Sequence, residues 1–213
     1  MSEKVRVAGV QMVSTIEVEE NLRAAAALID EAAQGGAKLI ALPEYFCLMG
    51  QRDTDKIARR EKDGDGPIQQ FLAEQARTHQ IWLVGGTVPL VAPEADRVLN
   101  STLVYGPTGE RVARYDKIHL FRFRKGAEDY DEARTIAPGR DVASFMLDGL
   151  RVGLSVCYDL RFPELYRAME RPDLILVPSA FTATTGRAHW EILLRARAVE
   201  NLSYVLAPAQ GGK

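Results

Sequence analysis

The sequence is poor in the residue types on which several common functions depend. Its 213 residues include only two cysteines and three histidines, widely separated, so the ligand spacings typical of zinc sites are missing. No run approaches the roughly 18 apolar residues that a membrane-spanning helix needs. We therefore expect no metal, no cofactor and no membrane partner.

A strong charge of either sign is also missing. Lysine and arginine total 27 and aspartate and glutamate total 29, which leaves a formal net charge of −2. This balance argues against nucleic acid as a partner, because proteins that bind it carry basic surfaces. The polar N-terminus leads directly into a strand-like run without a signal-peptide pattern, so we expect a cytoplasmic protein with free thiols.

The composition is that of an ordinary globular domain. Apolar residues make up 46% of the chain, and strand-like and helix-like segments alternate throughout. This alternation predicts a layered α/β fold in a single domain over residues 1–213. One helix is expected after Ser14 and Glu17, which have capping-box spacing, and another is opened by Pro67. Strands are expected at 5–13, 38–42, 81–90 and 173–179.

Two turns predict β-hairpins, and the two halves of the chain resemble each other. GPTGE separates two strand-like runs, and Asp148-Gly149 separates FML from LRVGLSVC. VRVAGVQ, a helix and KLIALPE in the first half are matched by LRVGLSV, a helix and DLILVPS in the second. Either an internal repeat or the convergence of two buried βαβ units explains this likeness.

Three strand-like segments each end in one reactive side chain. KLIALPEYF delivers Glu44, RVARYDKIHLF delivers Lys117, and LRVGLSVCYDLRFPE delivers Cys157. Cys157 precedes a helix that Pro163 is suited to start, where N–H donors and the positive end of the helix dipole favour a thiolate and an oxyanion. The other cysteine, Cys47, lies in the apolar run YFCLMG and is expected in the core.

The segments LPEYF, YDKIHLF and CYDLRFPE resemble motifs of the nitrilase, or carbon-nitrogen hydrolase, superfamily, which uses a Glu-Lys-Cys set. The resemblance extends along the chain. TTGRAHWE, LLRARAVEN and PAQGG are most similar to the Nit branch, which includes omega-amidases and deaminated glutathione amidases. The resemblance to this superfamily implies a four-layer αββα sandwich and a homo-oligomer. Related chains continue further, so this chain is expected to be incomplete at its C-terminus.

The resemblance also implies a reaction. A small amide that carries a carboxylate is hydrolysed to an acid and ammonia through a thioester of Cys157. Glu44 is expected to act as base and then acid, while Lys117 and the backbone N–H of Tyr158 bind the oxyanion. Glu132 matches a second glutamate of the family and is expected to orient Lys117.

Four more residues are candidates for supporting roles. Asp159 and Arg161 are expected to shape the turn after Cys157 through charge and hydrogen-bond contacts. Arg122 and Arg124 are candidates to hold the substrate's carboxylate, because a planar guanidinium suits that group. The alternative is that this basic cluster pairs with nearby acids on an exposed face.

Two other functions are compatible with these residues. In a Cys-His hydrolase, His119 or His189 would activate Cys157. The second alternative is a catalytically silent protein or a redox-sensing thiol protein. Thioester trapping separates this alternative from an amidase, since only a hydrolase is acylated at Cys157 by an amide and then turns over.

Overall fold

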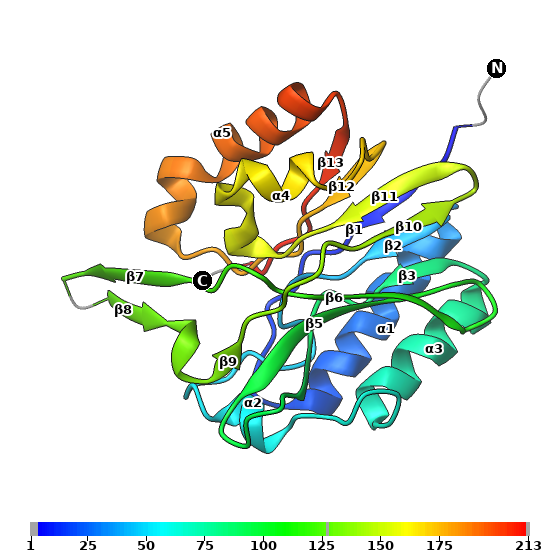
Figure 1. Cartoon of the computed structure of the whole chain (residues 1–213). Coiled ribbons are helices and arrows are strands. Elements are labelled where there is room, and N and C mark those ends of the chain that lie inside the picture. Colours follow the sequence, from blue (N-terminus) through cyan, green and yellow to red (C-terminus); the bar gives the residue numbers. More distant parts are fainter. Residues whose placement is uncertain (1–3, 127, 212–213) are drawn as a thin grey trace.

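Two β-sheets stacked between two layers of helices make up the fold (Figure 1). The computed structural model describes residues 4–126 and 128–211. Within these residues one sheet has seven strands, a second has four, and a two-stranded hairpin stands apart from both. This arrangement confirms the predicted αββα sandwich.

The larger sheet is organised around its longest strand, β5 (Val98–Tyr105). Its parallel part consists of β1 (Val7–Gly9), β2 (Leu39–Ala41) and β3 (Trp82–Val84). Strand β5 pairs antiparallel with β3, β4 (Val88–Val91) and β6 (Arg111–Asp116), and parallel with β9 (Ile136–Ala137). Helices α1 (Val18–Gln34) and α3 (Pro67–His79) cover its outer face.

The second sheet faces the first across a shared core. Its strands are β10 (Ser144–Leu147), β11 (Leu150–Leu154), β12 (Leu174–Leu176) and β13 (Tyr204–Leu206). The short helix η2 (Cys157–Arg161), α4 (Pro163–Arg167) and α5 (Ala183–Asn201) lie on its other side. One apolar cluster joins the two sheets, with Leu39 and Val84 from the first and Val152 and Ile175 from the second.

The two hairpins form as predicted. GPTGE joins β5 to β6, and Asp148-Gly149 joins β10 to β11. Asp148 has φ 46° and Gly149 has φ 89°, so both central residues are left-handed, as a tight hairpin turn requires. The two halves of the chain also share a topology. Each contains three parallel strands connected by helices, β1, β2 and β3 in the first half and β11, β12 and β13 in the second.

Two local predictions are wrong. Residues 81–90 form two strands because the chain bends at Gly86, whose φ is 47° and which lies so close to the Pro43 carbonyl that a Cβ would collide with it. The capping box is also absent, since the Ser14 hydroxyl donates to the Phe46 carbonyl (2.8 Å) and no side chain caps α1. Both departures involve the loop around residue 44.

Cys47 lies in the core, as predicted, and both cysteines are free and buried. The hairpin that stands apart consists of β7 (Arg122–Lys125) and β8 (Glu128–Asp131), and it projects from the body of the molecule (Figure 1). Within the described residues, no helix has both the length and the apolar character needed to cross a membrane.

Candidate active site

The three reactive side chains named by the sequence lie where strands of the two sheets end. Glu44 follows β2, Lys117 directly follows β6, and Cys157 follows β11. Their exposed fractions are 1%, 1% and 6%, respectively, so all three are buried. Charged side chains are rarely buried to this extent unless they are paired.

Lys117 is paired with two carboxylates. Its Nζ lies 3.0 Å from Glu44 Oε1 and 2.8 Å from Glu132 Oε2. We call Glu44, Lys117 and Glu132 the buried ion cluster. The contact predicted between Glu132 and Lys117 is therefore present. Glu132 begins the short helix η1 (Glu132–Arg134), and the Phe121 N–H also donates to it (2.7 Å).

The buried ion cluster fixes the charge of two of its members. Burial disfavours the ammonium of Lys117, but the attraction of Glu132 and Glu44 is stronger and raises its pKa well above the usual range. Burial also disfavours the Glu132 carboxylate, yet Lys117 and hydrogen bonds lower its pKa. Both groups are therefore charged at neutral pH.

Glu44 is held by donors from three distant segments. Oε1 accepts from Lys117 and from Asn100 Nδ2 (2.9 Å), and Oε2 accepts from the Ala180 N–H (2.9 Å). Burial raises the pKa of Glu44 above the usual range, although Lys117 and the Cys157 thiol act in the opposite direction. This carboxyl group therefore binds a proton more readily than Glu132 does.

Cys157 lies at a strained turn. Its φ is 49°, a left-handed conformation that costs a residue with a side chain about 1–2 kcal/mol. Its backbone N–H donates to the Pro178 carbonyl (2.9 Å), so this N–H is not free to bind an oxyanion. Burial, and then the Glu44 carboxylate, raise the pKa of the thiol well above the usual range, so the resting group is a neutral thiol, whose proton Glu44 is expected to accept. Pro163 starts α4 as predicted, but this helix has only five residues.

Two polar residues of the site were missed at the sequence level. The Tyr45 hydroxyl donates to Glu132 Oε1 (2.7 Å), and Asn100 contacts both Glu44 and this hydroxyl. Asn100 begins a short polar stretch, Asn-Ser-Thr, inside the strand-like run VLNSTLVY, and this interruption was the available indication. The sequence around Ala180 gives no indication of its role, because its N–H donates to Glu44, which lies 136 positions earlier in the chain.

Asp159 shapes the turn after the cysteine, as expected. It is fully buried and accepts hydrogen bonds from the Val156 N–H (2.9 Å), the Tyr115 hydroxyl (2.7 Å) and the His119 N–H (3.0 Å). Because Tyr115 and His119 flank Lys117, this carboxylate links the end of β6 to the Cys157 turn. It fixes the lysine and the thiol relative to each other.

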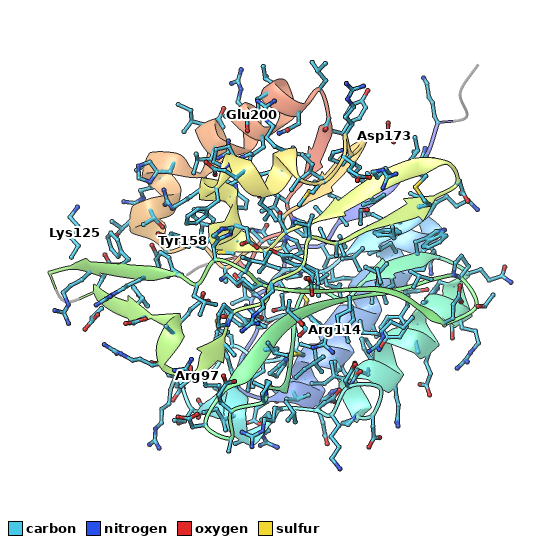
Figure 2. The ribbon with its side chains drawn as sticks, viewed as in Figure 1. Arg97, Arg114, Lys125, Tyr158, Asp173 and Glu200 are labelled. Atoms are coloured by element: carbon cyan, nitrogen blue, oxygen red, sulfur yellow. The ribbon has the colours of Figure 1, made fainter. Side chains whose placement is uncertain are left out.

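A cavity of about 350 Å³ opens onto the cluster. Glu44, Glu132 and Cys157 line it, as do Tyr158 and Arg161. Tyr158 packs edge-on against Phe121 and lies below α5 in Figure 2. The other lining residues include four charged ones, Arg52, Asp53, Lys56 and Asp131, and the aromatic and hydroxyl side chains of Tyr45, Tyr130, Phe181, Thr182 and Thr185.

The basic residues that line this cavity are Arg52, Lys56 and Arg161, and not Arg122 or Arg124. Arg122 and Arg124 line no part of it; their side chains are 82% and 77% exposed and lie near Asp131 (3.5 Å) and Asp129 (2.9 Å). This arrangement matches the alternative interpretation, in which the basic cluster pairs with nearby acids on an exposed face. The basic side chains of β7 face the acidic side chains of β8 across the hairpin. The Arg161 guanidinium instead contacts the His189 ring nitrogen (3.2 Å).

Neither histidine considered as a base lines the cavity. His119 Nδ1 lies 2.7 Å from Asp159 and its ring stacks on Phe162, while His189 faces Arg161. The geometry therefore gives no support to a Cys-His hydrolase. Among the described residues, no group of three or more His, Cys, Asp or Glu side chains is placed to hold a metal ion.

Comparisons with known proteins agree with this geometry. The sequence model of the carbon-nitrogen hydrolase family matches residues 6–213. A deaminated glutathione amidase of Synechocystis sp. is 41% identical over 211 residues, which cover 96% of this chain and 77% of that protein. Omega-amidase NIT2 of Homo sapiens is 38% identical over 214 residues, covering 98% and 76%.

Solved structures show the same fold. The crystal structure of Saccharomyces cerevisiae Nit3, described as a member of branch 10 of the nitrilase superfamily, superposes with a TM-score of 0.88 at 31% identity. The match covers 100% of this chain and 78% of that one.

Proposed function

Because this chain belongs to the carbon-nitrogen hydrolase family, we propose that it hydrolyses small carboxylate-bearing amides through a thioester of Cys157. The observation that carries this proposal is the juxtaposition of a buried thiol with the Glu44–Lys117–Glu132 ion cluster at the floor of one cavity. A nucleophile, a base and a fixed positive charge are the groups that acyl transfer requires.

The first half of the reaction uses Glu44 as the base. The resting thiol is neutral, so Glu44 accepts its proton while Sγ bonds to the amide carbon. The oxyanion is bound by Lys117, whose ammonium has three N–H donors for two carboxylates and the developing charge. Since the Cys157 N–H is already used, the backbone donor we assign is that of Tyr158, near the start of η2.

The second half restores the enzyme. Glu44 returns its proton to the nitrogen, the C–N bond breaks, and ammonia leaves a thioester at Cys157. Water then gives a proton to Glu44 while its oxygen attacks the thioester, and that proton returns to the sulfur as the acid leaves. The role of Glu132 is to hold Lys117 in place, and it does not exchange protons.

Arg161 replaces Arg122 and Arg124 as the residue that we assign to the substrate's carboxylate. Arg161 lines the cavity and lies four positions after Cys157. Among the described residues, no carboxylate oxygen lies within 4.0 Å of its guanidinium nitrogens. An amide with a carboxylate would supply that partner. The names of the two relatives, deaminated glutathione amidase and omega-amidase, are consistent with such a substrate.

This assignment is tested with paired amides that differ only in a distant carboxylate. We expect Arg161→Met to raise KM for the anionic amide roughly tenfold or more, since hydrogen bonds to charged groups contribute about 1.5–3 kcal/mol. The neutral amide should be affected little. The matched control is Arg124→Met, which removes an exposed guanidinium of the hairpin. Equal effects of both variants on both amides would remove the basis for the assignment.

We also infer a homo-oligomer and a cytoplasmic location. Four large apolar side chains are exposed on α5 and the segment that follows it: Ile192, Val199, Leu202 and Tyr204. Exposed apolar groups of this size are typical of interaction surfaces when they cluster. The cytoplasmic location is consistent with two free cysteines.

A further inference from the structure

Besides Arg161, two cations line the cavity, Arg52 and Lys56, and Lys56 is the less exposed of the two. Lys56 lies in α2 (Asp55–Ala58), at the lower edge of Figure 1, whereas Arg161 ends η2 directly before α4 in the upper layer. Its Nζ lies 4.4 Å from the centre of the Tyr45 ring. Within residues 4–126 and 128–211, no carboxylate oxygen lies within 4.0 Å of that Nζ.

The surroundings of Lys56 do not fully compensate its charge. Burial lowers the pKa of Lys56, and the attraction of Glu132, Glu44 and Asp53 does not offset that effect. A ring face contributes only about 0.5–2 kcal/mol to a cation above it. An anion that enters the cavity would therefore find a desolvated ammonium whose partner is a ring and not a carboxylate.

Lys56 is also connected to the buried ion cluster. The Tyr45 ring supports the ammonium on one side, and the Tyr45 hydroxyl donates to Glu132, which in turn holds Lys117. Arg161 lies at the end of the short helix that begins at Cys157. Lys56 and Arg161 thus enter the same cavity from two different elements, α2 and η2.

We propose that Lys56 binds a second carboxylate of the substrate, so that the site prefers amides with two carboxylates, one at Arg161 and the other at Lys56. A cavity of about 350 Å³ has room for a small molecule with two such ends. The reaction assigned to these amides rests on the proposed function, whereas the binding of a dicarboxylate by the two cations does not.

The competing role for Lys56 is to balance the negative charge of Glu44 and Glu132. A residue with that role would affect every ligand alike, because the charge of the cluster is the same for all of them. A carboxylate-binding residue discriminates between ligands with one and two carboxylates. This difference decides the experiment.

The first measurement is calorimetric binding of butyrate and of the dicarboxylates succinate, glutarate and adipate at fixed pH and salt. The intact protein should bind one length of dicarboxylate best. Lys56→Met should weaken that binding about tenfold, equivalent to ~1.4 kcal/mol, and leave butyrate unchanged. Lys56→Arg keeps the positive charge and should retain the preference for the dicarboxylate. Unchanged butyrate binding by Lys56→Met shows that its weaker dicarboxylate binding does not result from misfolding.

Lys125→Met is the matched control. Lys125 lies at the tip of the β7–β8 hairpin, pointing away from the body of the protein (Figure 2), and lines no part of the cavity. Its removal changes the net charge by the same amount and should leave the binding of all four ligands unchanged. If Lys56→Met weakens butyrate and dicarboxylates equally, or weakens neither, the inference is wrong.

The second measurement repeats the comparison with amide substrates that carry one or two carboxylates. Lys56→Met should lower kcat/KM selectively for the dianionic amide, mainly through KM. If no amide is hydrolysed while the dicarboxylate preference persists, the proposed function fails and the second anion site stands. If amides are hydrolysed without any preference for a second carboxylate, the site fails and the proposed function stands.

Discussion

Among single residues, the position of one proton decides how the site works. Burial raises the pKa of both Glu44 and Cys157, while Lys117 and Glu132 remain charged. The resting site therefore contains a neutral thiol beside a carboxyl group that can accept its proton. A permanent thiolate would be paired with the Lys117 ammonium and would leave it less able to bind an oxyanion.

The raised pKa of Glu44 predicts where activity is lost in acid. Glu44 must be ionised to accept the thiol proton, so kcat/KM should fall as the pH drops through its pKa, above the usual glutamate value of about 4.3. Asn100→Leu removes a hydrogen bond to the ionised form and should move this limb to still higher pH. A pH profile of the wild type and this variant checks both points; a limb that stays in place or moves down contradicts the assignment.

Among helices and strands, the hairpin between β10 and β11 has glycine at one of its two left-handed turn positions. Gly149 has φ 89°, and no atom lies within 4 Å of the position that a Cβ would take there, so Gly149→Ala introduces backbone strain without a collision. We expect the free energy of unfolding to fall by about 1–2 kcal/mol.

Gly186 in α5 provides the matched control, because it is helical and a Cβ there meets only Phe181, at an ordinary 3.8 Å. Gly186→Ala should raise the free energy of unfolding by up to about 1 kcal/mol. Denaturant titrations of both variants measure these changes. A fall of the same size in both would show that the hairpin turn has no special requirement for glycine.

These elements also show how far the sequence could predict the structure. Turn residues, helix starts such as Pro67 and the buried strand around residue 40 follow from local chemistry, and they were predicted correctly. The bend at Gly86 could not be predicted, because it depends on close approach to the Pro43 carbonyl from another strand.

The same division holds for the site. Glu44, Lys117 and Cys157 each follow a strand, a position that the sequence reveals. The partners of Glu44 lie 56 and 136 positions away, at Asn100 and Ala180, so only the folded chain identifies them. Arg122 and Arg124 lie outside the cavity, and their closeness to Lys117 in the sequence does not reveal that the hairpin projects away from it.

For the molecule as a whole, the layered arrangement leaves large apolar side chains of α5 and β13 outside the core. Ile192 and Val199 lie seven positions apart on α5 and therefore share a face, with exposed fractions of 66% and 74%. Leu202 and Tyr204, immediately after the helix, are 93% and 83% exposed. Pairing of such surfaces between copies of the chain would remove them from water.

We therefore predict that a charge on this face lowers the degree of association. Val199→Asp should reduce the mass measured by light scattering after gel filtration. Met146→Asp, at a half-exposed position on β10, is the control and should leave the mass unchanged. A wild-type mass equal to that of a single chain at high protein concentration would contradict the predicted homo-oligomer.

The proposed covalent role of Cys157 is the central claim about the reaction, and mass spectrometry tests it directly. The protein is mixed with a carboxylate-bearing amide, quenched with acid during turnover and digested. We predict that the peptide containing Cys157 gains the mass of the acyl group while ammonia is released, and that Cys157→Ala shows neither. Sustained release of ammonia without an adduct, and at an undiminished rate in Cys157→Ala, would contradict the thioester mechanism.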